Sequence, residues 1–210
     1  MNTSIFYLTI ITFLTFSLGQ AQIKLNDNEL NRLKTAVLEN ANKTETILSD
    51  FTQKKHLSIM EHAIVSEGKL AFQAPNFVKW EYTQPYKNIA IFKDDKLYVN
   101  DNGKKNILNL SSNKLFRSLN SLIVNSIKGD MFDDTQFEIS YFKNDDGFLV
   151  KFIPKDKRLK RFVAQFQLQF SKATTHVESV KLIEPNEDYT LIIFNNRQIN
   201  ATIPKNTFNH

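Results

Sequence analysis

Hydrophobic positions in this chain follow a helical period in two segments and a period of two almost everywhere else. In residues 25–46, apolar side chains recur three or four positions apart, at Leu30, Leu33, Val37 and Ala41. This spacing predicts an amphipathic helix, which Asn26 or Asp27 can cap. A second apolar stripe in residues 111–128 includes Leu119, Ile123 and Ile127, and it predicts a second helix that ends at Gly129.

The remaining segments alternate between apolar and polar residues, which predicts ten or eleven short strands. One begins after Ile47, and the others are expected at residues 65–73, 77–83, 88–93, 96–100, 104–110, 136–142, 148–153, 162–170, 177–183 and 189–195. The most regular of these is 162–170, in which every even position is apolar and Gln165, Gln167 and Gln169 occupy odd positions. We therefore expect this strand to have one buried face and one solvent-exposed polar face.

Many consecutive strands linked by hairpin turns favour a mainly β fold with helices, of the α+β class. We expect one strongly curved antiparallel sheet or an unclosed antiparallel β-barrel, with both helices covering its concave face. We find no linker or internal repeat. Residues 22–210 are therefore expected to form a single domain.

The N-terminus has the layout of a secretory signal peptide. Residues 5–18 are almost entirely apolar, and the small residues Gly19 and Ala21 precede an expected cleavage after Ala21. A membrane anchor is the alternative, but the apolar run of about 14 residues is shorter than the roughly 20 needed to span a bilayer. The sequence thus predicts export, with residues 1–21 removed.

Composition narrows the possible chemistry. The chain has no Cys, which excludes disulfides, thiolate metal sites and a Cys nucleophile. It has 18 Phe but only 5 Gly. This aromatic excess fits either a solid core or the wall of an apolar cavity, because both have the same periodicity.

Catalytic motifs are missing. The four His have no metal-site spacing, there is no Gly-rich phosphate loop, and the paired acids such as Asp94-Asp95 lie in predicted turns. We therefore expect a protein that is not an enzyme and has no metal or cofactor. The net charge of +5 is compatible with several anionic partners, but export and the lack of nucleic-acid motifs argue against nucleic acid.

Five basic residues cluster between two predicted strands. These residues, called the basic loop below, are Lys155, Lys157, Arg158, Lys160 and Arg161. They form either an ordinary solvated loop or a docking patch for anionic lipid or an acidic partner protein.

Short motifs appear in an order that resembles a known family. Phe51-Thr52-Gln53 resembles the F-x-Q start of the periplasmic outer-membrane lipoprotein carriers, the LolA family. The run Gly68-Lys69-Leu70, Ala74-Pro75-Asn76, Trp80-Glu81-Tyr82 and Pro85 is similar to that family's G-x-L, Pro-Asn turn, W-x-Y and Pro. Asp94 to Tyr98 and the ending through Phe208 also fit, so the resemblance covers nearly all of residues 22–210.

The resemblance implies an open barrel with helices as a lid over an apolar cavity. Such a carrier is periplasmic and monomeric, accepts lipoprotein acyl chains or another lipid from an inner-membrane transporter, and delivers them to an outer-membrane acceptor. The implied ligand wall consists of Phe51, Leu70, Phe72, Val78, Trp80, Tyr82, Ile91 and Leu97, and Leu119, Ile123 and Ile127 would come from the lid.

One position departs from the family pattern. Many members carry an Arg immediately before the Pro of the Pro-Asn turn, and that Arg holds the lid closed, whereas this chain has Ala74. A specialised carrier of another lipid, such as an aryl-polyene-type pigment precursor, is therefore one alternative. An envelope interaction protein with a solid core and no ligand is the other.

Overall fold

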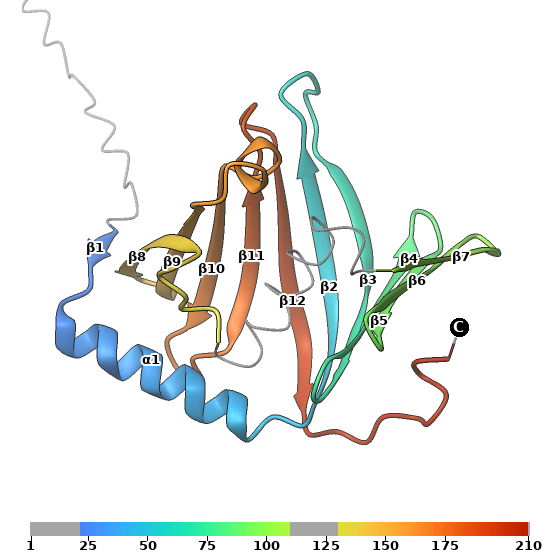
Figure 1. The fold of residues 1–210 in the computed structure, drawn as a ribbon, viewed down its shortest axis with the longest axis horizontal. Coiled ribbons are helices and arrows are strands. Elements are labelled where there is room, and N and C mark those ends of the chain that lie inside the picture. The colour runs from blue at the N-terminus through green and yellow to red at the C-terminus, as the bar shows by residue number, and fades with distance from the viewer. Residues whose placement is uncertain (1–21, 110–129, 210) are drawn as a thin grey trace, which may run out of the picture.

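The computed structural model describes residues 22–109 and 130–209 (Figure 1). The predicted signal peptide, residues 1–21, and the predicted second helix, residues 111–128, lie outside the described residues. So do the three expected lid residues Leu119, Ile123 and Ile127. Among the described residues, no helix is both long and apolar enough to cross a bilayer.

The described part of the chain contains one α-helix, one 3₁₀ turn and twelve strands. In chain order these are β1 (Ile23–Lys24), α1 (Asp27–Asn42), β2 (Thr46–His56), β3 (Ile64–Gln73), β4 (Phe77–Gln84), β5 (Asn88–Lys93), β6 (Lys96–Asp101), β7 (Lys104–Asn109), β8 (Phe137–Asn144), β9 (Gly147–Pro154), η1 (Leu159–Arg161), β10 (Gln165–Ser171), β11 (Val177–Ile183) and β12 (Tyr189–Ile199).

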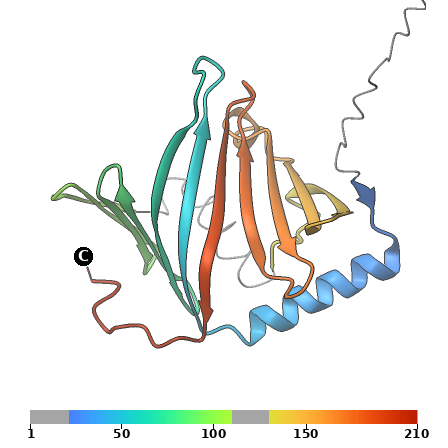
Figure 2. The same cartoon turned by 180° about the vertical axis from the view of Figure 1, so that it is seen from behind.

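All twelve described strands belong to one antiparallel sheet in the order β1-β8-β9-β10-β11-β12-β2-β3-β4-β5-β6-β7. The C-terminal strand β12 pairs with β2 and so joins the two halves of the sheet. Strands β1 and β7 are the two edges, and the sheet curves strongly between them (Figures 1 and 2). The structure therefore confirms a mainly β fold built on an unclosed antiparallel sheet.

Helix α1 begins at the predicted cap. The Asn26 side chain accepts a hydrogen bond from the Glu29 backbone N–H, and the Glu29 carboxylate accepts one from the Asn26 backbone N–H. The helix lies across one end of the strands, where Leu33 and Val37 pack against residues of β8–β10 (Figure 1). It is the one α-helix in the described residues, so the expected covering of the concave face by two helices is not confirmed.

Strand β10 is shorter than its alternation predicts. It starts at Gln165, because residues 159–161 form a 3₁₀ turn in which the Phe162 and Val163 N–H groups donate to the Leu159 carbonyl. Val163 is therefore buried, while Phe162 is 52% exposed instead of facing the core. The glutamine pattern of the remaining strand does alternate with buried Phe166, Leu168 and Phe170 as expected.

Three apolar clusters lie on the two faces of the sheet, two on one face and one on the other. We call the face that carries Trp80 and Phe194 the inner face. One inner cluster joins α1 to β8–β10, and the other centres on Phe51, Phe72 and Trp80 in β2–β4. The third lies on the outer face, where Phe208 of the C-terminal tail packs with the side chains of β3–β5.

Candidate functional site

A cavity of about 220 Å³ lies between the two inner clusters. Its wall comes from α1, the segment after it, strands β2–β4 and β9–β12, the β10–β11 turn and the segment before β8. The apolar lining consists of Val37, Ala41, Ile47, Leu70, Trp80, Met131, Phe152, Phe166, Leu168, Phe170, Val177, Val180, Leu182, Ile192 and Phe194. The polar lining consists of Asn40, Thr44, Thr175, His176, Thr190 and Arg197.

Strand register explains why the wall is so apolar. Across neighbouring strands, directly paired residues share a face, and alternate residues of each strand point to it. Ile192 pairs with Val180, which pairs with Leu168, so one row of apolar side chains crosses three strands. An apolar cavity of about 150 Å³ can already bind a small hydrocarbon, so this volume can accept an apolar ligand.

Only two residues of the predicted ligand wall that the structure describes line the cavity. Leu70 and Trp80 line the cavity. Phe51, Phe72, Val78 and Leu97 are buried in the same inner cluster as Trp80, and the Phe51 and Trp80 ring centroids are 4.9 Å apart. These four residues are not part of the cavity lining; they pack beside Trp80.

The two remaining predicted residues, Tyr82 and Ile91, do not line the cavity either. Tyr82 packs against the same inner cluster as Trp80, whereas Ile91 lies on the other face of the sheet. The Tyr82 hydroxyl donates a hydrogen bond of 2.9 Å to Gln53 Oε1, and burial raises the pKa of this phenol. Ile91 pairs with Lys79 and Tyr98, and paired residues point to the same face of the sheet. Lys79 and Tyr98 are the chain neighbours of Trp80 and Leu97, which point inward, so Ile91 points to the outer face. It packs with Ala71 and Phe208, so it is separated from the cavity by the sheet.

Most of the polar lining gathers at one end of the cavity, where the C-terminal half of α1 meets the β10–β11 turn and the end of β12. Asn40 Nδ2 donates to Thr175 Oγ1 at 2.7 Å and to the Thr174 carbonyl at 2.6 Å. Arg197 Nη2 donates to the Val177 carbonyl. We call Asn40, Thr44, Thr175, His176 and Arg197 the polar end of the cavity.

Burial and charge act together on the two titratable groups of the polar end. Burial, and then the nearby Arg197 charge, lower the pKa of His176 below its usual 6.5, so the imidazole is neutral at pH 7. Burial also lowers the pKa of Arg197, partly offset by the charge of Glu178, but a guanidinium remains protonated in proteins. The polar end therefore carries one positive charge beside an apolar wall.

Sequence reasoning missed Arg197 because a β-bulge interrupts the strand. Simple alternation from Ile192 and Phe194 places residue 196 inward and Arg197 outward. The pairing with β2 instead shifts by one residue between Asn195 and Gln198, and Asn196 has φ +51°. The pair Asn195-Asn196 within an apolar strand was the available signal, since Asn is depleted in strands and tolerates positive φ.

The basic loop occupies the other end of the strands. Its five basic residues are exposed around η1. The β2–β3 hairpin extends at the same end (Figures 1 and 2), and its exposed apolar residues are Ile59, Met60, Ile64 and Val65. In the described residues, no group of three or more His, Asp or Glu is arranged to hold a metal ion.

An open antiparallel sheet with an apolar cavity on its inner face is the class of fold to which this chain belongs. Within that class the chain belongs to a known family: the model of the outer membrane lipoprotein carrier protein LolA matches residues 42–210. The chain is 22% identical over 158 residues to the outer-membrane lipoprotein carrier protein of Pseudoalteromonas translucida, covering 75% of this chain and 70% of that protein.

Solved structures share the fold at low identity. An uncharacterized conserved protein from Thermus thermophilus aligns with a TM-score of 0.52 at 7% identity, covering 86% of this chain and 93% of that one. A DUF1329 family protein from Desulfovibrio piger aligns with a TM-score of 0.50 at 10% identity, covering 86% and 97%. These two comparisons support the open-sheet fold alone.

Proposed function

We propose that this chain is a periplasmic carrier that shelters lipoprotein acyl chains in its inner-face cavity and moves them from the inner to the outer membrane. The observation that carries the proposal is the apolar cavity between the two inner clusters, in a chain of the lipoprotein carrier family. Residues 1–21 would be a cleaved signal peptide. An inner-membrane transporter would supply the cargo, and an outer-membrane acceptor would receive it.

The hydrophobic effect explains why such a cargo needs a carrier. Each methylene group removed from water contributes on the order of 0.8 kcal/mol. An acyl chain therefore stays in a membrane unless an apolar wall replaces the bilayer. The row formed by Leu168, Val180 and Ile192 offers such a wall without any catalytic group, which fits a carrier better than an enzyme.

Two other functions lead to different outcomes. A specialised carrier of another lipid would use the same cavity, and Ala74 at the position of the family's lid Arg favours this reading. An envelope interaction protein without a ligand would need no cavity. Lipid analysis of the protein purified from its native envelope separates these readings, because a lipoprotein, another lipid or no lipid would be recovered.

Adjacent residues of β12 provide a matched test. Ile192 lines the cavity, whereas Ile193 points to the outer face and pairs with Thr52 and Ser179. Ile192→Trp should fill the cavity and weaken binding of a fluorescent fatty-acyl probe at least about tenfold, by steric exclusion. Ile193→Trp should leave the probe affinity unchanged. Equal affinities of the two variants, or no binding by the wild type, would contradict the carrier proposal.

We also propose that the basic loop docks the carrier on an anionic membrane surface. Positive side chains close to exposed apolar ones favour attachment to anionic lipid, because charge attracts the protein and the apolar groups enter the interface. The basic loop and the apolar residues of the β2–β3 hairpin lie at the same end of the strands (Figure 1).

A further inference from the structure

The cavity is chemically asymmetric. Its apolar wall ends at the polar end, where Arg197 is half-buried beside Thr175 and His176. Of the remaining polar lining residues, Thr190 lies toward the opposite end of β12, where it pairs with Lys55. A ligand bound in this cavity therefore meets hydrocarbon along most of its length and a positive charge at one end.

The β-bulge in β12 fixes the direction of the Arg197 side chain. The bulge at Asn196 places an extra residue in β12, and Asn196 Nδ2 donates to Asp50 Oδ2 at 2.8 Å. Ser49 Oγ donates to the Asn195 carbonyl at 2.7 Å and so fixes the other side of the bulge. The guanidinium carbon lies 5.9 Å from the Phe194 ring centroid, in cation–π contact. Arg197 is thus held at the cavity wall.

Arg197 forms no ion pair with a carboxylate of the described residues. The ion pairs in residues 22–109 and 130–209 join Lys79 to Glu81 and Lys143 to Glu29. Glu178 acts on Arg197 only from beyond ion-pair distance. A guanidinium has five N–H donors in a fork that matches a carboxylate or phosphate, whereas a carbonyl such as that of Val177 engages only part of it.

We propose that the cavity selects amphiphiles with an anionic headgroup, a carboxylate or a phosphate, which Arg197 binds while the acyl chain lies along the apolar wall. His176 lies beside the headgroup, and its neutral imidazole can donate one further hydrogen bond, whereas the Thr175 hydroxyl already donates to the Thr174 carbonyl. This assignment rests on the proposed carrier function. Because acyl groups attached to a protein as esters or amides have no free carboxylate or phosphate, it favours the reading in which the carrier's cargo is another lipid. It also orients the ligand, with its polar group toward α1 and its chain toward β3 and β4.

Three ligands with the same alkyl chain test the assignment. Dodecanoate and dodecyl phosphate are anionic, and methyl dodecanoate is uncharged. Their affinities are measured at pH 7 by displacement of the neutral probe N-phenyl-1-naphthylamine. The wild-type protein should bind both anions, or one of them, at least about tenfold more tightly than the ester, because charge-assisted hydrogen bonds to a guanidinium are stronger than neutral ones.

Substitutions then assign the preference to Arg197. Arg197→Gln should bring the ratio of the anion affinity to the ester affinity, both measured in that variant, close to one. Arg197→Lys should keep part of the preference, because it retains the charge without the fork. Arg32→Gln removes an exposed arginine of α1 as the matched control, and it should behave like the wild type.

Each outcome has a distinct meaning. If the wild type binds the ester but shows no preference for either anion, or if Arg197→Gln keeps the preference, the headgroup assignment is wrong and the carrier proposal stands. If the wild type binds none of the three ligands, both are wrong. A preference for only one anion supports the assignment and identifies the headgroup as a carboxylate or a phosphate. Because the comparison is made first in the wild type, it does not depend on folding of the variants.

Discussion

At the scale of single residues, Gly68 explains part of the motif that opens β3. Gly68 pairs directly with Phe51 across strands β3 and β2, and the Phe51 ring occupies the space that a side chain at position 68 would need. In this position Phe51 reaches Trp80 and Tyr82, with ring centroids 4.9 and 5.1 Å away. The glycine therefore allows one aromatic side chain to organise the inner cluster of β2–β4.

Substituting Gly68 tests this explanation. The Cβ of Gly68→Ala would lie 2.5 Å from Phe51 Cζ and against the Glu81 carbonyl. We expect the free energy of unfolding to fall by about 1–3 kcal/mol, as for other overpacked cores. Urea denaturation measures it, and Ser66→Ala in the same strand is the control that adds no bulk. If both variants were as stable as the wild type, Phe51 would not be confined by Gly68.

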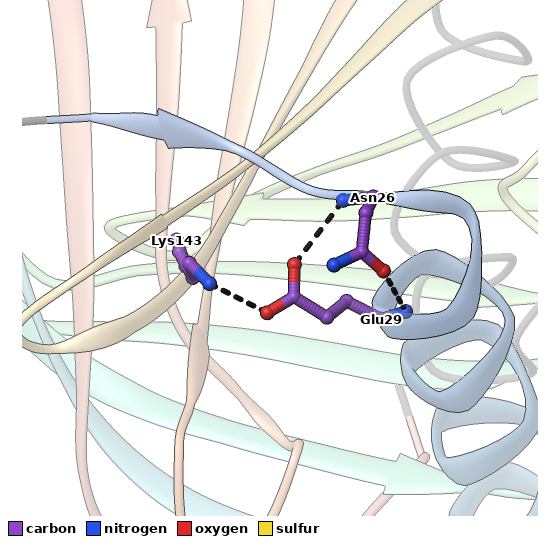
Figure 3. A network of polar contacts seen from close by, with 3 residues as sticks. All are labelled: Asn26, Glu29 and Lys143. Carbon is purple, nitrogen blue, oxygen red and sulfur yellow. Dashed lines mark hydrogen bonds and ion pairs between the residues drawn. The ribbon is translucent and has the colours of Figure 1, made fainter.

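At the scale of elements, one carboxylate fixes the position of helix α1. Glu29 accepts a hydrogen bond from the Asn26 backbone at 3.1 Å and forms an ion pair with Lys143 of β8 at 2.5 Å (Figure 3). The first contact closes the capping box, and the second ties the start of the helix to the sheet. Because α1 supplies Val37, Asn40 and Ala41 to the cavity, its placement also shapes the site.

This arrangement makes part of the stability depend on pH. The contact with Lys143, followed by the Asn26 backbone N–H, holds the pKa of Glu29 below its ordinary value of 4.5. A carboxyl whose pKa is lower in the folded state stabilises the fold above its unfolded pKa and loses that effect as the pH falls through the folded pKa.

The stability advantage of the wild type over Glu29→Gln should therefore be constant at neutral pH and decrease as the pH falls below about 4.5. Urea denaturation at a series of pH values measures the difference. Glu39→Gln, an exposed glutamate on the same helix, is the matched control. A difference that stays the same down to pH 3 would show that the charge of Glu29 does not stabilise α1.

At the scale of the whole molecule, the two ends of the strands have different properties. The polar end of the cavity lies near α1, whereas the basic loop and the apolar β2–β3 hairpin lie at the opposite end (Figure 1). If the basic loop docks on membranes, its charges should govern attachment without changing ligand affinity, because they lie away from the cavity lining.

Charge reversal tests this separation. Lys157→Glu/Lys160→Glu should reduce co-sedimentation with vesicles containing phosphatidylglycerol at low salt, and the probe affinity should stay unchanged. The matched control Lys104→Glu/Lys105→Glu makes the same charge change on exposed β7. Equal losses from both variants would indicate a non-specific effect of net charge, and no loss from either would refute docking through the basic loop.

Much of the fold was predictable because its signals are local. The helical period at Leu33 and Val37, the cap at Asn26 and the turn at Asn102-Gly103 each depend on residues a few positions apart. The face of Val78, Trp80 and Tyr82 followed from alternation in the same way. Phe162 was misplaced because the 3₁₀ turn before it overrides the alternation of β10.

The cavity was less predictable than the fold because it depends on distant pairings. Leu70 and Trp80 were expected and line it, but Val180, Leu182 and Ile192 join them only because β12 pairs with β2. Ile91 was misassigned because its strand offers apolar side chains to both faces, and only register shows which one faces inward.

The sequence by itself determined helix α1, most of the strands, the mainly β antiparallel class and the family, because hydrophobic period, turn residues and short motifs depend on residues close together in the chain. The tertiary structure alone decided which apolar residues enclose a cavity and which form solid clusters, since both have the same pattern. It also decided the direction of Arg197, because a single extra residue at a bulge reverses the face of the side chains that follow it.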